Sequence, residues 1–271
     1  MLSDITLGQY FPAKSFIHRM DPRLKICLTV YFIVLVFSSK NFLNIGLVYA
    51  VILGAMAASK VPAKIYIKSL KPILFIVAFT SILNLFYGTG EPLVQFWVLK
   101  ITLNGILNAL LIAVRIIALI FVSSVLTFTT SPTQLTDALE RLLKPLAKIR
   151  VPVHEFAMMM TIALRFVPTL LEETDKIMSA QKARGADMES GGIVQRIKAL
   201  IPVLIPLFVS AFRRAFDLAT AMESRCYTGG YGRTKMKTLK ISKADVITMI
   251  FCAVFLAGFI ALNIVLPKVV R

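Results

Sequence analysis

The chain has 271 residues, of which 57% are hydrophobic, and its formal net charge is +17. A soluble domain is typically about half apolar, so this composition, with a mean hydropathy of +0.78, indicates a membrane protein. The cysteines, Cys27, Cys226 and Cys252, show no spacing typical of a disulfide framework or a metal site, and the mixed, polar amino-terminal segment does not read as a cleavable signal peptide.

Five apolar segments are long enough to cross a bilayer, since about 17–25 residues span its hydrocarbon core. In chain order they cover residues 24–39, 42–58, 71–87, 102–128 and 245–266. The first is short by this measure and is expected to extend beyond these limits. The sequence therefore predicts an all-α membrane protein with about five transmembrane helices.

The basic residues set the orientation of these spans. With the amino terminus in the cytoplasm, 26 of the 31 Lys and Arg lie in cytoplasmic segments, 18 of them in residues 130–243. The opposite orientation would place those residues outside, so the positive-inside rule predicts a cytoplasmic amino terminus. The chain then divides into a four-span membrane portion over 1–128, a cytoplasmic region over 129–243 and a C-terminal transmembrane helix over 244–271.

Two features of the spans point to contacts with other helices. Gly54 and Ala58 form a small-xxx-small pair, which permits close helix approach. Asn104, Asn108 and Arg115 lie on roughly one face of the fourth span, and a charge within the membrane is a functional-site hypothesis by default. No acidic residue lies in the middle of a span to complete a proton relay. We expect this face to meet another membrane protein, or Arg115 to reach the cytoplasmic surface by snorkelling.

The region after the fourth span is predicted to hold a short helix and two long ones. Ser131 is the expected N-cap of the short helix, and Pro132 suits its first position. The first long helix starts at Pro152 and continues to Arg184. Gly185 follows, and glycine suits a left-handed C-terminal cap.

The two long helices carry apolar stretches, 156–171 and 199–212, that resemble spans. The second stretch has 14 residues, fewer than a span needs, and Arg165 interrupts the first. Both stretches continue into polar helix, so we expect amphipathic helices at or just below the membrane interface, or packed against the spans. Two additional spans are an alternative that would preserve the orientation. The second long helix is predicted to reach about Arg225, and the glycines at 229–230 are expected to end it.

Each long helix ends in an arginine between small residues. The two triplets are Ala183, Arg184 and Gly185, and Ser224, Arg225 and Cys226. Small neighbours leave a guanidinium free to enter a cleft and bind carboxylates through paired hydrogen bonds. The alternative is a contact with the helix dipole, worth about 0.3–1 kcal/mol, followed by an ordinary cap. The repetition of the same tip favours docking to a partner.

The sequence contains no recognisable motif of a nucleotide-hydrolysing or metal-dependent enzyme. A phosphate loop requires the pattern GxxxxGK[ST], and the nearest segment, GGYGRTK at 229–235, lacks that spacing. His18 and His154 have no metal-like partner in the sequence, so we expect structural roles for both. We expect no catalytic residue, metal site or cofactor on this chain.

Taken together, the motifs resemble the transmembrane T component of energy-coupling factor transporters. They are FIHRMDPRLK (16–25), LTFTTSPTQLTDALERLLKPL (126–146), LRFVPTLLEE (164–173), QKARGAD (181–187) and AMESRCY (221–227), and the resemblance runs from about residue 15 to 237. In that family, two cytoplasmic coupling helices each end in an Ala-Arg-Gly motif that docks in a groove of an ATPase subunit. Arg184 and its neighbours match this motif. Around Arg225 both flanking residues are replaced, but serine and cysteine are still small, so docking is expected.

The resemblance implies a membrane scaffold in an ATP-driven importer for a vitamin or similar micronutrient. Its expected partners are two ABC-type ATPases, which bind ATP and Mg, a substrate-binding membrane subunit and the lipid of a cell membrane. Gly54, Ala58 and the face with Arg115 are expected contacts with the membrane subunit. Two alternatives remain, a stand-alone secondary transporter or channel, and a membrane-attached nucleic-acid or lipid-binding protein. The basic region lacks interleaved exposed aromatics, so we expect no nucleic-acid partner.

Overall fold

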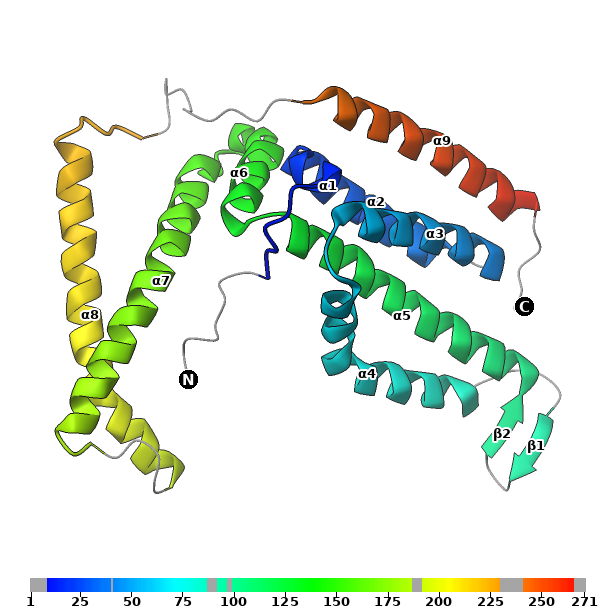
Figure 1. Cartoon of the computed structure of the whole chain (residues 1–271), viewed down its shortest axis with the longest axis horizontal. Coiled ribbons are helices and arrows are strands. Elements are labelled where there is room, and N and C mark those ends of the chain that lie inside the picture. Colours follow the sequence, from blue (N-terminus) through cyan, green and yellow to red (C-terminus); the bar gives the residue numbers. More distant parts are fainter. Residues whose placement is uncertain are drawn as a thin grey trace. The chain divides into compact units, whose positions relative to one another are not determined.

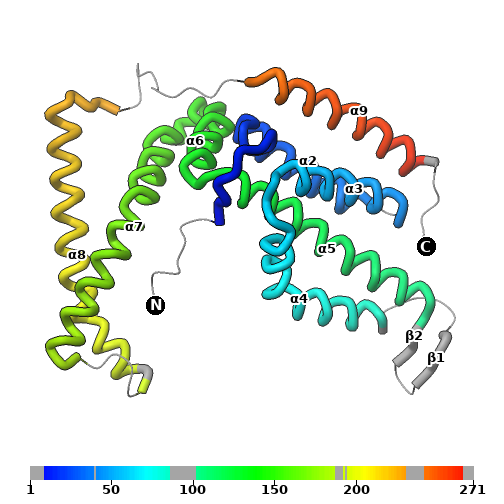
Figure 2. Tube along the Cα trace, viewed as in Figure 1, coloured from blue at the N-terminus to red at the C-terminus, as the bar shows by residue number. Residues whose placement is uncertain are grey.

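The computed structural model describes residues 9–39, 41–86, 92–96, 99–186, 192–229 and 241–265. These residues form helices α1–α9, a 3-10 helix η1 and a hairpin of strands β1 and β2 (Figures 1 and 2). They fall into two compact units. The membrane unit comprises Gln9–Ala138 and the residues from Thr238 onward, and the coupling unit comprises Leu139–Lys237. The all-α prediction is confirmed, with the hairpin as a short exception.

The membrane unit contains the predicted spans. Its elements are α1 (Phe16–Arg19), α2 (Pro22–Ser38), α3 (Phe42–Ser59), α4 (Ala63–Phe86), β1 (Pro92–Phe96), β2 (Leu99–Thr102), α5 (Leu103–Thr129) and α9 (Lys243–Val265). The antiparallel hairpin connects α4 to α5. Helix α4 begins before the apolar segment predicted as a span from residue 71, and its additional first turns contain lysines, which are good helix formers.

The coupling unit contains η1 (Lys144–Ile149), α7 (Val153–Ala183) and α8 (Ile193–Glu223), and α6 (Pro132–Leu143) leads into it from the membrane unit. The predicted start of α6 is confirmed by a capping box: Ser131 Oγ accepts the N–H of Gln134 at 3.3 Å, and Gln134 Oε1 accepts the N–H of Ser131 at 3.3 Å. Pro152 directly precedes α7, as predicted.

Five helices of the described chain are long and apolar enough to cross a membrane, namely α3, α4, α5, α8 and α9. Four of these match predicted spans. Helix α2 has 17 residues, the lower limit for a span. Helix α8 has 31 residues and is therefore much longer than the 14-residue stretch that argued against a span there. Its length and composition alone would permit it to cross.

The core of the membrane unit lies where α2, α3, α5 and α9 meet. Its buried residues are Leu35, Val36, Val48, Ile52, Ala118, Val122 and Phe259. A second cluster joins the start of α4 to the end of α5, where the rings of Tyr66 and Phe128 meet edge to face at 5.1 Å. These contacts fix the relative positions of helices that are far apart in the sequence.

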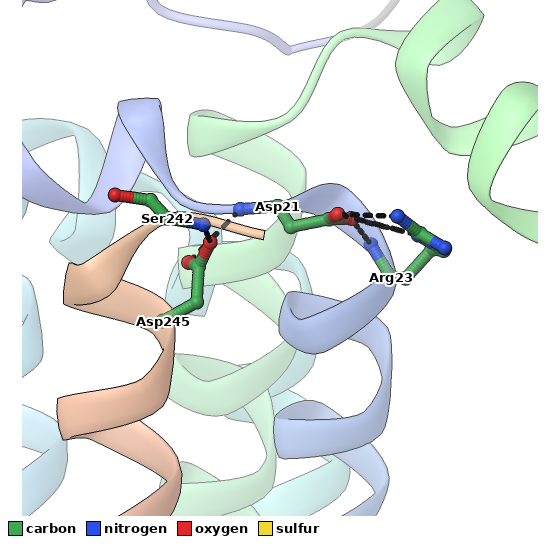
Figure 3. A network of polar contacts seen from close by, with 4 residues as sticks. All are labelled: Asp21, Arg23, Ser242 and Asp245. Atoms are coloured by element: carbon green, nitrogen blue, oxygen red, sulfur yellow. Dashed lines mark hydrogen bonds and ion pairs between the residues drawn. The ribbon is translucent and has the colours of Figure 1, made fainter. Parts of the chain in front are cut away.

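A buried polar network joins the segment before α2, near the amino terminus, to the first turn of α9 (Figure 3). Asp245, in the first turn of α9, accepts the N–H of Ser242 at 2.7 Å and the N–H of Asp21 at 3.2 Å. The Asp21 carboxylate caps α2 and forms an ion pair with Arg23 at 2.8 Å. Nearby on α2, Lys25 donates its Nζ to the Thr129 carbonyl at 2.9 Å. The amino-terminal motif therefore ties α2 to the start of α9 and the end of α5.

The two histidines form structural contacts within their own units. His18 Nε2 lies 2.9 Å from the Phe11 carbonyl, and His18 Nδ1 lies 2.7 Å from Ser15 Oγ. His154 Nδ1 lies 2.9 Å from Glu140 Oε1 and so joins the start of α7 to α6. These contacts agree with the structural roles that the sequence predicts.

Candidate functional site

Among the described residues, polar contacts join the antiparallel helices α7 and α8 at three places along their length. At one end Gln181 donates to the Pro202 carbonyl at 3.2 Å. Midway, Arg214 forms an ion pair with Glu173 at 2.9 Å, and Ser210 donates a short hydrogen bond to the same carboxylate. At the other end the Tyr227 hydroxyl donates to Met158 Sδ at 2.9 Å.

The antiparallel arrangement places the two arginine tips at opposite ends of the pair (Figure 1). Arg184 follows the last residue of α7, whereas Arg225 precedes Tyr227, which lies against the first turns of α7. The helix between Met158 and Arg184 covers about 26 residues, or about 39 Å at 1.5 Å per residue.

The tip of α7 ends in a Schellman motif. The N–H of Ala186 donates to the Gln181 carbonyl, and the N–H of Gly185 donates to the Lys182 carbonyl, both at 3.0 Å. Gly185 has φ +86°, in the left-handed region predicted for it, and a Cβ built there meets no atom within 4 Å. The glycine is therefore required by the backbone conformation rather than by a close neighbour. Arg184 occupies the C-cap position.

The tip of α8 has the same backbone hydrogen bonds. The N–H of Tyr227 donates to the Met222 carbonyl at 3.0 Å, and the N–H of Cys226 donates to the Glu223 carbonyl at 2.8 Å. Cys226 has φ +56° and takes the left-handed position that Gly185 takes in α7. The prediction that the glycines at 229–230 end this helix is wrong, because Cys226 already ends it. Of the GGYGRTK segment, only Gly229 lies within the described residues.

The side chains of both tips are exposed. Ala183, Arg184 and Gly185 are exposed at the end of α7, and Ser224, Arg225 and Cys226 are exposed at the end of α8. Within the described residues, neither guanidinium forms a hydrogen bond or an ion pair. Each guanidinium can therefore offer its full set of donors to an acidic cleft.

A continuous apolar stripe runs along the exposed face of α8. It comprises Val194, Ile197, Ile201, Ile205, Phe208, Phe212 and Phe216, all with more than 45% of their surface exposed. On α7, Phe156, Met159 and Met160 are also exposed. An exposed apolar surface of this length marks a contact with lipid or with another protein. The coupling unit therefore presents a long apolar face in addition to its two basic tips.

The predicted polar face of α5 is only half-exposed. Asn104, Asn108 and Arg115 are all partly buried. Arg115 Nη2 donates to the Ser39 carbonyl at 2.8 Å, and its Nε is buried without a hydrogen-bond partner among the described residues. Ser39 follows the end of α2 that lies away from the amino terminus. If the amino terminus is cytoplasmic, as predicted, this hydrogen bond directs Arg115 away from the cytoplasmic surface and favours the contact with another membrane protein over snorkelling.

The small residues of α3 do not make a close helix contact in this chain. A Cβ built at Gly54 meets no atom within 4 Å. Gly54 and Ala58 instead line a cavity of the membrane unit. The small-xxx-small interpretation therefore fails for packing within the chain.

Sequence reasoning missed the contacts that hold α7 against α8. Glu173 and Arg214 are 41 positions apart, and each lies among other charged residues that are equally plausible partners. No local spacing identifies such a pair, since an antiparallel register is set by packing along the whole interface. The conformation of Cys226 was missed for a different reason, because a non-glycine residue carries no strong signal for a left-handed cap.

Comparison with known proteins places the chain among transport proteins. Residues 13–238 match the family model CbiQ, described as cobalt transport protein. The energy-coupling factor transporter transmembrane protein EcfT of Ruminiclostridium cellulolyticum is 50% identical over 265 residues, which cover 98% of this chain and 99% of the relative. Proteins of the same description from Clostridium kluyveri and Acidaminococcus fermentans are 51% and 50% identical over 94% of this chain, and over 95% and 96% of their own lengths.

Proposed function

Because the chain belongs to the family of energy-coupling factor transporter transmembrane proteins, the T components, we propose that it is the scaffold of an ATP-driven importer. Two partner ATPases bind and hydrolyse ATP with Mg, and this chain contributes no catalytic residue. A separate membrane subunit, the S component, binds the substrate, a vitamin or similar micronutrient. The chain is a multi-pass membrane protein, and its amino terminus lies in the cytoplasm of the cell.

The observation that carries this proposal is the pair of exposed arginines at opposite ends of α7 and α8, neither of which has a polar partner among the described residues. Their separation of about 39 Å along the helix suits two ATPase subunits better than one. Each guanidinium enters an acidic groove and binds a carboxylate through two hydrogen bonds. Cys226 takes the place of a glycine without changing the backbone hydrogen bonds of the cap, which supports docking at the second tip.

Coupling follows from the contacts between the two helices. When ATP brings the ATPases together, their grooves carry Arg184 and Arg225 with them, and α7 and α8 change their crossing. The described polar contacts join the pair at three places, whereas the apolar stripe of α8 is exposed. Helices with few fixed contacts can slide or tilt at low energetic cost. The apolar stripe of α8 then moves the S component between orientations.

The coupling helices lie at the membrane interface rather than across it. Helix α7 packs along α8, so both helices occupy the same depth. The second half of α7 carries Glu172, Glu173, Asp175 and Lys176, and a central charge costs about 2.5–3.5 kcal/mol on insertion scales. Crossing would bury this charged segment in lipid. The apolar face of α8 is covered at the interface by lipid and by the S component, to which Asn104 and Asn108 of α5 are also candidate contacts.

The test is retention of the two ATPases by the detergent-purified chain after charge reversal at the tips. Arg184→Glu and Arg225→Glu each convert a paired contact into a like-charge one, and breaking such a pair costs about 2–5 kcal/mol. We expect each single variant to lose part of the ATPase and the double variant to lose all of it. Arg213→Glu is the matched control, because Arg213 is an exposed arginine of α8 away from the tip.

Two results would contradict the proposal. A folded, monodisperse double variant that retains both ATPases would show that the arginines are only helix caps. Substrate accumulation by vesicles that contain this chain and no ATPase would show a stand-alone transporter instead.

A further inference from the structure

An apolar cavity of about 650 Å³ lies within the membrane unit, bordered by α1, α2, α3, α5 and α9. Its polar lining residues leave almost no free hydrogen-bonding group. Thr29, Thr129 and Thr248 each donate their hydroxyl to a carbonyl of their own helix at 2.6–2.9 Å. Lys25 donates to the Thr129 carbonyl at 2.9 Å. The cavity therefore suits a hydrocarbon rather than a polar solute or water.

Small side chains create this space. Ala50, Gly54, Ala55 and Ala58 line the cavity from α3, and a Cβ added at Gly54 would meet no atom within 4 Å. The cavity is open on one side, because its lining residues Gly54, Ala58 and Phe251 are exposed at the surface. Its size lies within the roughly 300–1,000 Å³ range of ligand sites. For an apolar cavity of a membrane protein, the most abundant apolar molecules nearby are the lipids of the bilayer.

The length of the cavity matches one leaflet of a bilayer. Along α3 its lining extends from Leu47 to Ala58, about 11 residues or about 16 Å. Half of a hydrocarbon core is about 15 Å thick. One end is formed by Phe16 and Lys25, near the predicted cytoplasmic surface, and the other lies midway along α2 and α9 at Phe32 and Phe255. A transmembrane helix of a partner would cross both leaflets, whereas one acyl chain ends where this cavity ends.

Basic side chains lie at the cytoplasmic end of the cavity. Lys14 and Arg19 are exposed and lie within two residues of the lining residues Phe16 and Ile17. Among the described residues of the membrane unit, the acidic groups on this side are Asp21, Asp137 and Asp245. Asp21 is paired with Arg23, Asp137 is partly buried, and Asp245 accepts two backbone N–H groups. The exposed charges next to the lining residues are those of Lys14 and Arg19, which match the anionic lipids of the cytoplasmic leaflet.

We propose that this cavity binds one acyl chain of an anionic phospholipid from the cytoplasmic leaflet, whose headgroup lies against Arg19 and Lys14. The bound chain fills the gap that small residues leave between α3 and its neighbours. It completes the packing of the membrane unit beside the network of Asp21 and Asp245. The proposal depends on the cytoplasmic orientation of the amino terminus, and it does not depend on ATPase docking.

The test measures lipid bound to the full-length chain. The protein is purified in detergent, stripped of lipid, incubated with phosphatidylglycerol or with phosphatidylcholine of the same acyl chains, and examined by native mass spectrometry. We expect one phosphatidylglycerol per chain. Gly54→Leu fills the cavity and should weaken retention about tenfold, since it displaces at least two buried methylenes. Gly46→Leu is the matched control, because Gly46 has open space on the same helix but does not line the cavity.

Two further variants test the preference for an anionic headgroup and provide an alternative if Gly54→Leu does not fold. Arg19→Gln should lower the preference for phosphatidylglycerol over phosphatidylcholine about fivefold, the value of one basic residue near an anionic surface. If Gly54→Leu is not monodisperse, Ala58→Leu replaces it. Equal lipid retention by the cavity-filling variant and the Gly46→Leu control would overturn the proposal. Equal binding of the two lipids by the wild-type chain would overturn the assignment of an anionic headgroup.

Discussion

The membrane unit and the coupling unit differ in how much of each is buried by its own chain. The membrane unit has a core at the junction of α2, α3, α5 and α9, and buried polar residues such as Asp21, Lys25 and Asp245. Among the described residues of the coupling unit, only Val153, Ala157 and Val203 are buried, all of them apolar. The membrane unit is held together by contacts within the chain, whereas the coupling unit leaves the apolar surface of α7 and α8 exposed.

The two units also differ in the polar contacts that hold their helices together. Buried polar groups are costly unless they are paired, so the network around Asp245 holds its helices in one arrangement. The α7–α8 pair has mainly partly exposed polar contacts, which contribute little individually. The proposed coupling requires a fixed part and a movable part, and the distribution of buried polar groups distinguishes two such parts.

The largest effect, a loss of transport, is expected from cross-linking α7 to α8. Glu173 and Ser210 are in direct contact across the helix pair. In a chain whose cysteines are replaced by serine, Glu173→Cys with Ser210→Cys can be joined by a short bifunctional thiol reagent. We expect ATP-dependent substrate uptake in proteoliposomes to fall to background, because α7 and α8 can no longer change their crossing.

Two controls decide whether the cross-link acts on movement. The same double variant before treatment, and each single-cysteine variant after treatment, should transport normally. ATPase retention should be unchanged by the cross-link, because both arginine tips lie away from it. Normal uptake by the fully cross-linked protein would contradict the lever mechanism while leaving the docking proposal intact.

The next largest effect, a loss of stability, is expected from removing the buried carboxylate of Asp245 in the membrane unit. Asp245→Ala removes the acceptor of the buried Asp21 N–H and the acceptor of the Ser242 N–H. Leaving the buried Asp21 N–H unsatisfied should lower the free energy of unfolding by about 1–3 kcal/mol. Asp245→Asn keeps an amide oxygen and should lose less. Thermal unfolding in detergent measures both, and equal stability of Asp245→Ala and the wild-type chain would show that the network contributes nothing.

A smaller effect, of opposite sign at the two tips, is expected from the helix caps. Gly185→Ala places a Cβ at φ +86° and should destabilise the end of α7 by about 1 kcal/mol. Cys226→Gly relieves a non-glycine residue at φ +56° and should stabilise the end of α8 by up to about 1 kcal/mol. Hydrogen exchange of the last turn of each helix reports these changes. Slower exchange in Gly185→Ala, or faster exchange in Cys226→Gly, would contradict the shared cap geometry.

Sequence reasoning succeeded where the signal was local. The start of α6 at Ser131, the start of α7 after Pro152 and its end before Gly185 all follow from caps that involve only neighbouring residues. Four of the five predicted spans, those of α3, α4, α5 and α9, followed from length and hydropathy alone. The hairpin β1–β2 was missed because it is short and adjoins a span.

The remaining features depend on residues that are distant in the sequence. Asp21 and Asp245 are 224 positions apart, and nothing in the sequence of either segment indicates that they meet. The cavity was missed for a related reason. Gly54 and Ala58 were interpreted as a helix-contact motif, and a small residue indicates equally a close neighbour or an open space. Within this chain they border an open space, and their predicted contact with another membrane subunit stays a prediction.

Arg115 provides the test with the smallest expected effect. Arg115→Leu removes a hydrogen bond to the Ser39 carbonyl, which would cost about 0.5–1.5 kcal/mol, but it also removes a buried Nε that has no described hydrogen-bond partner. The two terms oppose each other, so we expect little change in melting temperature and full retention of both ATPases. Arg115 belongs to the membrane unit, whereas the proposed ATPase contacts lie at the tips of the coupling unit. Loss of the ATPases from a stable Arg115→Leu variant would mean that the membrane unit also controls docking, and the division between a fixed and a movable part would fail.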